Sequence, residues 1–316
     1  MKLIFLGTPE FAVPALQKMV SGRHLVAAVL SQPDRPQGRN QQILPTPVKR
    51  AAQAAGIPIF QPDNPNEAGA LEKIRAIQPD CAIVVAYGRL LSRDFLDLFP
   101  KGVYNLHASL LPKYRGAAPI QWALINGEPE TGVTVFRIDE QLDHGPILLQ
   151  KKLPIDPQDN GETLFSRLAK LGAETLAEAV DKIAEGSAAL KPQDESKATL
   201  APRLSKETGR IDWNLDCRQI HHLIRGVQPW PGAFTALEGR ELKILAASFD
   251  PAQNDSSADP GAIVSADPAL GLWVQTGQGQ IRIDRLQTAG GKPLAAADYL
   301  RGHPIRPGSR FQSEQA

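Results

Sequence analysis

Short apolar runs alternate with amphipathic stretches over the first part of the chain. The runs at 2–6, 25–30 and 81–86 are continuous and rich in residues that favour buried strands. Helical spacing or helix caps follow at 14–19 and 68–77, so strands and helices are expected to alternate. This alternation predicts an α/β domain with a Rossmann-like, mostly parallel sheet.

The same reasoning predicts further elements of this domain. They are helices at 47–56, 92–99, 117–125 and 162–183, strands at 102–107, 133–138 and 147–150, and a long polar loop at 31–42.

The second half of the chain has a different pattern. From residue 191 the composition shifts to Pro, Ser, Lys, Asp and Glu, which predicts a linker at 191–205 between domains at 1–190 and 206–316. Beyond it, strand candidates at 233–237, 242–247, 272–276 and 281–286 are separated by polar loops. Such short strands predict a smaller antiparallel β-barrel, similar to the oligonucleotide-binding (OB) type.

Composition narrows the class of protein. With 316 residues, 42% hydrophobic and 22% charged, the chain is expected to be a soluble protein with two cores. The net charge of +1 means that any nucleic-acid contact must come from local clusters of Lys and Arg. Cys81 and Cys217 have no near partner, which argues against a disulfide framework or a cysteine zinc site. No signal peptide or membrane-spanning run is present, so a cytoplasmic protein is expected.

One strand and the loop after it carry the clearest candidate chemistry. If 102–107 is a strand, Val103, Asn105 and His107 share one face. The strand runs into a loop with Pro112, the end of an α/β sheet where ligands usually bind. An amide beside an imidazole can stabilise a carbonyl oxygen as it becomes an oxyanion. The alternative is that both side chains only bind neighbouring backbone and catalyse nothing.

Two other patterns argue against a metal site and against a dinucleotide cofactor. The loop 139–146 holds three carboxylates and a histidine, but their spacing matches no usual ligand pattern, so no metal is expected. After the first strand, Gly7 is followed by Thr8, Pro9 and Glu10 and not by further glycines. Because a dinucleotide fingerprint needs three glycines, NAD is not expected.

Several blocks resemble one family. His107-Ala-Ser-Leu-Leu-Pro-Lys-Tyr-Arg-Gly-Ala-Ala-Pro-Ile120 resembles the signature of enzymes that transfer a formyl group from 10-formyltetrahydrofolate. Further matching blocks are Gly7-Thr-Pro-Glu-Phe-Ala12, Gln32-Pro-Asp-Arg-Pro36, Asp143-x-Gly145-Pro146, Gly209-Arg-Ile-Asp-Trp213 and Pro229-Trp-Pro-Gly232. Together they cover nearly the whole chain and resemble the methionyl-tRNA formyltransferase family.

This resemblance implies a function and a mechanism. The protein is expected to transfer the formyl group of 10-formyltetrahydrofolate to the α-amino group of methionyl-initiator tRNA, for translation initiation. The implied catalytic residues are Asn105, His107 and Asp143. Asn105 and His107 would stabilise the oxyanion, and Asp143 would support His107, since a nearby carboxylate favours the charged imidazolium. Either Asp143 or water would take the proton of the attacking amine.

The resemblance also implies binding residues and partners. For the folate co-substrate they are Tyr87, Gly88, Arg89, Leu90, Ser109, Leu110, Leu111, Pro112 and Asp139. For tRNA they are Arg35, Arg39, Lys206 and Arg210, the last two in the C-terminal barrel. Asn40, Gln41 and Gln42 follow Arg39 where relatives often have basic residues, which weakens this loop's attraction for RNA. A monomer without a membrane partner is expected.

Alternatives remain at this stage. The catalytic block alone suits a formyltransferase acting on an amino sugar nucleotide, or a formyltetrahydrofolate hydrolase. A non-catalytic RNA-binding relative with the same fold is a further alternative. The Arg39 loop and the second domain favour the tRNA enzyme.

Overall fold

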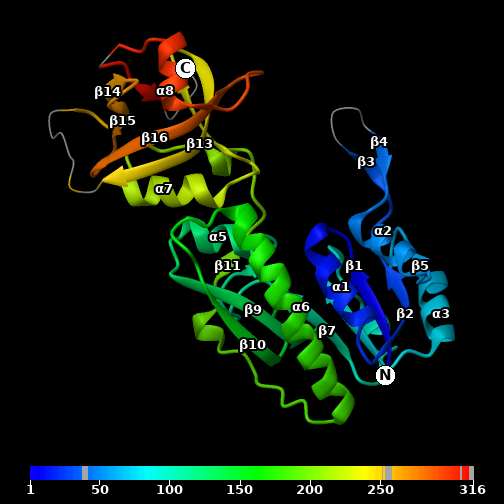
Figure 1. Cartoon of the computed structure of the whole chain (residues 1–316). Helices are drawn as coiled ribbons and strands as arrows, with labels where there is room; N and C mark the ends of the chain where they lie inside the picture. Colours follow the sequence, from blue (N-terminus) through cyan, green and yellow to red (C-terminus); the bar gives the residue numbers. More distant parts are fainter. Residues whose placement is uncertain (38–41, 251, 253–257, 307, 313–316) are drawn as a thin grey trace. The chain divides into compact units, whose positions relative to one another are not determined.

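The chain folds into two compact units. The computed structural model describes residues 1–37, 42–250, 252, 258–306 and 308–312 (Figure 1). The first unit comprises Met1–Pro119, Glu130–Pro154 and Phe165–Ala201, and the second comprises Ile120–Pro129, Ile155–Leu164 and Pro202–Ala316. Within the described residues, no helix combines the length and the apolar character needed to cross a bilayer.

A mixed sheet organises the first unit. In the described part of the chain it has seven strands, in the order β10-β9-β7-β6-β1-β2-β5. Their bounds are β1 (Lys2–Gly7), β2 (Leu25–Leu30), β5 (Ile59–Phe60), β6 (Cys81–Val85), β7 (Val103–His107), β9 (Glu130–Arg137) and β10 (Ile147–Pro154). The strands from β5 to β7 run parallel, whereas β9 and β10 are antiparallel to their neighbours. The predicted Rossmann-like, mostly parallel sheet is therefore confirmed.

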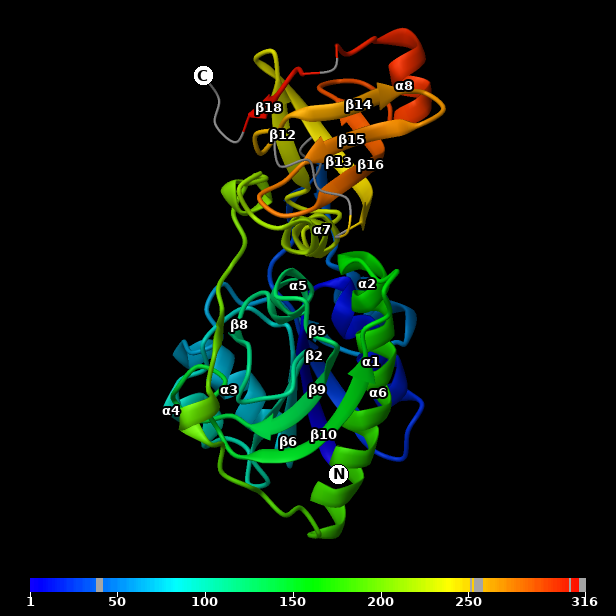
Figure 2. The same ribbon diagram turned by 90° about the vertical axis from the view of Figure 1, so that its left-hand side faces the viewer.

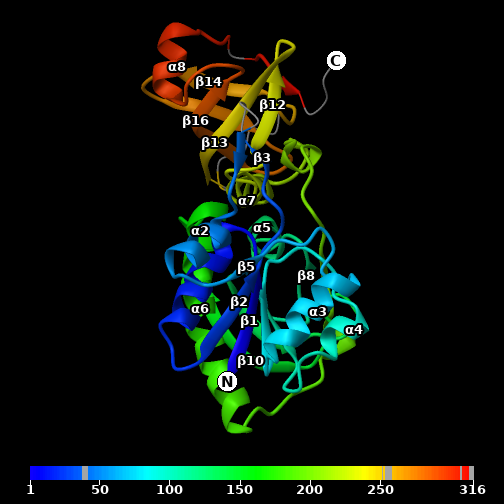
Figure 3. The same ribbon diagram turned by 90° about the vertical axis from the view of Figure 1, so that its right-hand side faces the viewer.

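Helices cover both faces of this sheet. Helices α1 (Val13–Val20), α2 (Pro47–Ala54) and α6 (Gly161–Glu185) lie on one face, and α3 (Ala68–Ile77) and α4 (Arg93–Leu96) on the other (Figures 2 and 3). Local signals start two of them. The hydroxyl groups of Thr46 and Ser92 accept hydrogen bonds from the first turns of α2 and α4. A short 3-10 turn, η1 (Glu10–Ala12), precedes α1.

The side chains of the strands divide between the two faces. Ile4, Val84 and Val103 pack in one buried cluster with residues of α3 and α4. A Cβ added at Gly172 of α6 would lie 2.8 Å from a methyl group of Leu106, so Leu106 of β7 contacts the opposite helix layer. Val103 and Leu106, three positions apart on β7, thus face opposite layers, as the alternation of side chains along a strand requires.

The polar stretch expected as a loop at 31–42 is partly a hairpin. Strand β3 (Arg35–Gln37) pairs in antiparallel fashion with β4 (Gln42–Leu44). Arg39, Asn40 and Gln41, in the connection, lie outside the described residues. The hairpin has no apolar run long enough to predict a strand. Its two apolar residues, Ile43 and Leu44, are exposed and form no buried face.

The second unit is a curled antiparallel sheet. Its described strands are ordered β14-β15-β16-β13-β12-β18, and β17 pairs with β16. The bounds are β12 (Ala233–Leu237), β13 (Arg240–Asp250), β14 (Ile263–Asp267), β15 (Gly271–Gln275), β16 (Gln280–Thr288), β17 (Leu294–Ala295) and β18 (Phe311–Gln312). Its two edges meet, because Ile263 and Phe311 donate backbone hydrogen bonds to Ser309 and Gly261. The predicted antiparallel barrel is confirmed, although β14, β17 and β18 were not expected.

An apolar core and several helical elements complete this unit. Helix α7 (Cys217–Gly226) starts with a capping box between Asp216 and Gln219. Trp213 is 1% exposed and stacks on Phe311 at a ring distance of 5.3 Å. The other helical elements are α5 (Pro119–Ile125), the 3-10 turn η3 (Glu207–Gly209) and α8 (Ala296–Gly302).

Candidate functional site

Asn105 and His107 lie on one face of β7. The register of β7 against β9 pairs Asn105 with Phe136 and His107 with Thr134, with no irregularity between them. His107 is 6% exposed, whereas Asn105 is half-buried. Within the described part of the chain the Asn105 amide has no hydrogen-bond partner. Its donors are therefore available to a ligand.

The hydrogen bonds of His107 determine its tautomer. Its Nε2 lies 2.8 Å from the carbonyl oxygen of Tyr114. A carbonyl only accepts, so Nε2 carries a proton and donates it. The other ring nitrogen, Nδ1, lies 3.7 Å from Oδ2 of Asp143. Nδ1 is consequently the atom of His107 that faces the carboxylate.

Asp143 lies in the loop between β9 and β10. Its φ of +50° is in the left-handed region, which is unfavourable for a residue with a Cβ. The carboxylate Oδ2 accepts a hydrogen bond of 2.8 Å from the backbone N–H of Gly116. His144, the next residue, instead binds Asp139, with 2.6 Å between Nδ1 and Oδ2. The irregular backbone at Asp143 thus turns two neighbouring side chains toward different partners.

The predicted folate residues 109–112 form a tightly bonded turn after β7. The Ser109 hydroxyl donates to the carbonyl of Lys113, and its own carbonyl accepts from Thr134. The carbonyl and N–H of Leu111 bind Gln150 and Thr134. Ser109 and Leu111 are buried, while Leu110 and Pro112 are partly exposed. The turn is rigid because its backbone is bonded to β9 and β10.

The predicted folate residues 87–90 follow β6. Tyr87 is 1% exposed, and burial raises the pKa of its hydroxyl to about 12. That hydroxyl has no partner among the described residues. Gly88 has a φ of +80°, and Leu90 is 77% exposed although it is apolar. Asn66 holds the turn by donating to the Leu90 carbonyl. The turn therefore presents backbone and an apolar side chain to solvent.

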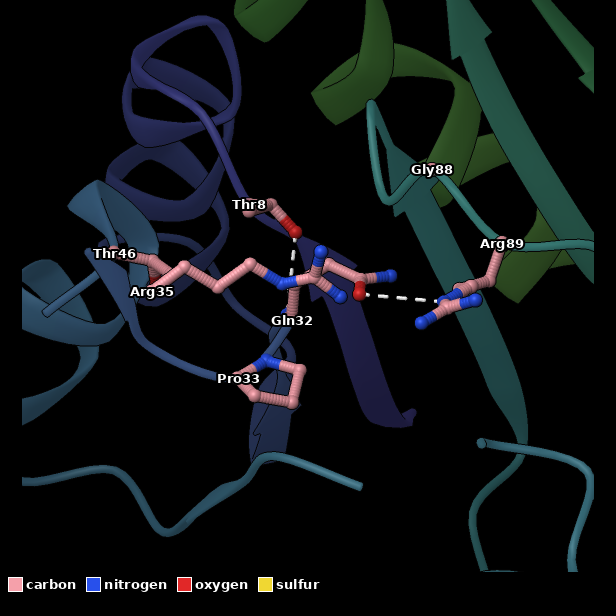
Figure 4. Close-up of a pocket in the computed structure, with 7 residues that line it drawn as sticks. All are labelled: Thr8, Gln32, Pro33, Arg35, Thr46, Gly88 and Arg89. Atoms are coloured by element: carbon pink, nitrogen blue, oxygen red, sulfur yellow. Dashed lines mark hydrogen bonds between the residues drawn. The ribbon is translucent and has the colours of Figure 1, made fainter. Parts of the chain in front are cut away.

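A cavity of about 420 Å³ lies beside this turn (Figure 4). It is lined by Thr8, Gln32, Pro33, Arg35, Thr46, Gly88 and Arg89. Gln32 accepts from Arg89 at 3.3 Å and donates to the Tyr87 carbonyl at 3.2 Å, so it orients the Arg89 guanidinium. No carboxylate lines the cavity, and its cationic lining residues are Arg35 and Arg89.

The nearest acid in the sequence, Asp34, is already paired. It lies 2.5 Å from the ammonium of Lys49 and accepts from Gln61 at 2.7 Å. Burial by itself would raise the pKa of Asp34, but these hydrogen bonds outweigh it and the pKa is lowered. Asp34 therefore does not neutralise Arg35, which has no acidic partner in the described part of the chain.

The other predicted tRNA residues lie in the second unit. The guanidinium of Arg210 and the ammonium of Lys206 stand 5.1 Å and 5.4 Å from the ring centre of Phe234. Each also has an acidic partner, Glu207 for Arg210 and Glu241 for Lys206. Their charge is partly compensated. Arg39 lies outside the described residues, so its surroundings are not described.

In the 139–146 loop, the carboxylate of Asp139 is paired with a histidine of the same loop. Among the described residues, no three His, Cys, Asp or Glu side chains lie close enough together to hold a metal ion. Asp139 binds His144, and His144 Nε2 lies 3.5 Å from Glu195.

Three residues that sequence reasoning missed surround this loop. Arg115, Gln193 and Glu195 form a hydrogen-bonded group beside Asp143. Arg115 belongs to the block that resembles the formyltransferase signature, but no role was inferred for it. Gln193 and Glu195 fall in the polar stretch at 191–205 that was expected to be a linker. A polar stretch without periodicity has the same composition whether it is solvated or bound to a site.

Comparisons with known proteins agree with these observations. Residues 1–180 match the model of the family described as formyl transferase, and residues 203–304 match that of the formyl transferase C-terminal domain. A methionyl-tRNA formyltransferase of Moorella thermoacetica is 46% identical over 98% of both chains. One of Geotalea uraniireducens is 45% identical over 98% of this chain and 97% of its own.

A solved structure supports the fold. The N-formyltransferase of Helicobacter canadensis, in complex with folinic acid and dTDP-3-aminofucose, superposes with a TM-score of 0.67 at 18% identity. The match covers 92% of this chain and 100% of that one. With near full-length relatives above 40% identity and both family models matched, the chain belongs to the methionyl-tRNA formyltransferase family.

Proposed function

We propose that this protein transfers the formyl group of 10-formyltetrahydrofolate to the α-amino group of methionyl-initiator tRNA. The product is formylmethionyl-tRNA, which serves translation initiation. One observation carries the proposal: in a chain of this family, the Asn105 amide, which has no partner among the described residues, stands beside a His107 whose Nδ1 faces Asp143. The proposed setting is a monomer in the cytoplasm.

The proposed reaction is an acyl transfer. The methionyl amine attacks the formyl carbon, forming a C–N bond and placing negative charge on the formyl oxygen. Asn105 donates to this oxygen, and a protonated His107 adds positive charge beside it. Collapse of the intermediate breaks the bond between the formyl carbon and the folate nitrogen. The amine loses a proton to Asp143 or to water, and the folate nitrogen gains one.

The folate is proposed to bind between two turns. Residues 87–90 supply backbone groups and the exposed side chain of Leu90, against which an apolar ring can pack. Residues 109–112 supply the rigid turn after β7, and Asp139 lies in the loop that carries Asp143. The Tyr87 hydroxyl, which no described residue binds, is consistent with a polar ligand in this region. These groups suit a flat heterocycle with polar edges, such as a pterin.

Two domains are proposed, one for catalysis and one for tRNA binding. Residues 1–190 form the catalytic domain, 191–205 the linker and 206–316 the tRNA-binding domain. The residues proposed to contact tRNA are Arg35, Arg39, Lys206 and Arg210. Arg35 has the strongest support of these, because it lines the cavity and has no acidic partner in the part of the chain that the structure describes. Lys206 and Arg210 contribute less free charge, since each is paired with a glutamate.

Replacing Arg35 by alanine is expected to raise the KM for methionyl-tRNA and leave the KM for folate unchanged. The reason is that a guanidinium that is not already paired with a carboxylate gains the most binding free energy from contact with a phosphate. Loss of one phosphate contact reduces the slope of log affinity against log salt by about 1. Arg75→Ala, at an exposed position of α3, is the matched control for net charge and should have neither effect. An Arg35→Ala protein with the wild-type KM and salt slope would contradict the assignment.

A transfer assay tests the function. The protein is incubated with 10-formyltetrahydrofolate and either methionyl-tRNA or a nucleotide-linked amino sugar, and the formylated product is identified. Formylation of methionyl-tRNA alone is expected. Formylation of the amino sugar, or release of formate without an acceptor, would replace the proposal by one of these two reactions. Binding of tRNA without any transfer would indicate that the protein is a non-catalytic RNA-binding relative.

A further inference from the structure

The segment after α6 is bonded to both loops of the candidate site. Lys191 and Ile147 exchange backbone hydrogen bonds of 2.7 and 2.8 Å, directly after the Asp143 loop. Nine residues after Lys191, strand β11 (Leu200–Ala201) pairs in parallel with β8 (Arg115–Gly116), shortly after the turn at 109–112 that follows His107. Between these two attachments lies the 3-10 turn η2 (Glu195–Lys197). The segment therefore bridges the chain regions that carry Asp143 and His107.

Gln193 makes the central contacts of this bridge. Its Nε2 donates to the carbonyl oxygens of Asp143 and Gly145, at 2.8 and 2.9 Å. Its Oε1 accepts from Nε and Nη2 of Arg115, at 3.2 and 2.7 Å. Carbonyls only accept and a guanidinium only donates, so the orientation of the amide is determined. All of its hydrogen-bonding capacity is used.

Arg115 is itself held firmly. Its side chain is 9% exposed and binds both carboxylate oxygens of Glu195, at 2.9 and 2.6 Å. These bonds raise the pKa of Arg115 despite its burial, and they lower the pKa of Glu195. The acceptor side of Gln193 is thus bound to a buried guanidinium, which makes a bidentate ion pair with the exposed Glu195.

Asp143 needs such support. Its left-handed φ of +50° is unfavourable, so other contacts must maintain it. Gln193 binds the carbonyls on either side of His144, and Gly116, the neighbour of Arg115, binds the Asp143 carboxylate. A Cβ at Gly145 would lie 1.8 Å from the carbonyl oxygen of Arg137, so the loop has little room to shift there.

We infer that Gln193 is a positioning residue, which holds the Asp143 carboxylate opposite Nδ1 of His107 by binding the carbonyls of Asp143 and Gly145. The inference deepens the proposed function and rests on it. Gln193 contacts no reacting atom in this arrangement. It acts through Asp143, so its loss should change the rate of transfer and not the binding of either substrate.

The test replaces Gln193 by methionine, which has similar length and no donors, and by glutamate, which places oxygen against the two carbonyls. Turnover in formyl transfer should fall by about 10- to 100-fold, because small misplacements of a catalytic group cost this much. Both KM values should stay within about threefold. Gln53→Met, at an exposed position of α2, is the matched control and should behave as wild type. Wild-type turnover in both variants, or a change confined to KM, would overturn the inference.

A second arm asks whether Gln193 acts through Asp143. In an Asp143→Asn background, Gln193→Met should slow transfer by less than about threefold, since residues that act as a unit are not additive. A full additional loss would overturn the inference. Unfolding of both Gln193 variants would also overturn it, because Gln193 would then serve stability and not orientation.

A third readout does not depend on the reaction. The ring nitrogen NMR signals of His107 should shift in Gln193→Met and in Asp143→Asn but not in Gln53→Met. If wild type formylates no acceptor, the proposed function fails, and these signals still test the placement of Asp143. Unchanged His107 signals in Gln193→Met would overturn the inference even if wild type is active.

Discussion

Replacing Asn105 by alanine is expected to lower the turnover number by about 10²- to 10³-fold, the usual cost of losing one preorganised oxyanion donor. The Asn105 amide has no partner among the described residues, so its removal leaves no buried group unpaired. Stability and the KM for folate should therefore change little. Steady-state and single-turnover rates with methionyl-tRNA measure the effect.

Asn105→Asp is the companion variant. It has the same shape but replaces the donor by a negative charge, which repels the developing oxyanion. It should be at least as slow as Asn105→Ala. If Asn105→Ala kept turnover within a few-fold of wild type, Asn105 would have no part in stabilising the transition state.

Replacing Asp143 by asparagine is expected to reduce turnover by about 10²-fold or more, in the range associated with general acid–base groups. The substitution keeps an oxygen that can accept from Gly116 but removes the charge that faces Nδ1 of His107 at 3.7 Å. Without that charge the His107 ring beside the oxyanion loses its acidic partner. Single-turnover rates with saturating substrates measure the chemical step.

Asp143→Ala distinguishes the effect of the carboxylate charge on turnover from its structural role as a hydrogen-bond acceptor. It removes both the charge and the acceptor of Gly116, so it should match Asp143→Asn in turnover. It should also unfold more easily, by about 1 to 3 kcal/mol, since the partly buried N–H of Gly116 loses its partner. Near-normal transfer by Asp143→Asn would exclude the carboxylate charge from the mechanism, and water would remain as the route for the amine proton.

Several elements could be predicted because their signals are local. Residues 68–77 and 233–237 were predicted with the bounds that the structure gives. Apolar periodicity and caps act over a few residues, so they are visible in one sequence. The shared face of Asn105 and His107 follows from the period of a strand in the same way. The resemblance of whole blocks to one family then indicated the activity, which periodicity does not determine.

Other elements were missed or incomplete because nothing local distinguishes them. Strand β14 and the β3–β4 hairpin lack a strong apolar pattern, although each pairs with a strand close by in the sequence. Strands β9 and β10 extend beyond the predicted ranges because each pairs with the other along its whole length. Closure of the barrel through residues 261–263 and 308–311 likewise depends on chain ends that periodicity does not connect.

The sequence by itself determined the two kinds of fold, the strand that carries Asn105 and His107, and the family to which the chain belongs. Only the tertiary structure decided which nitrogen of His107 faces Asp143 and what holds that aspartate. The Gln193 amide reaches a carbonyl 50 positions earlier in the chain and a guanidinium 78 positions earlier. Such contacts form only when the folded chain brings residue 193 beside the site. The residue types of a polar segment do not predict that position.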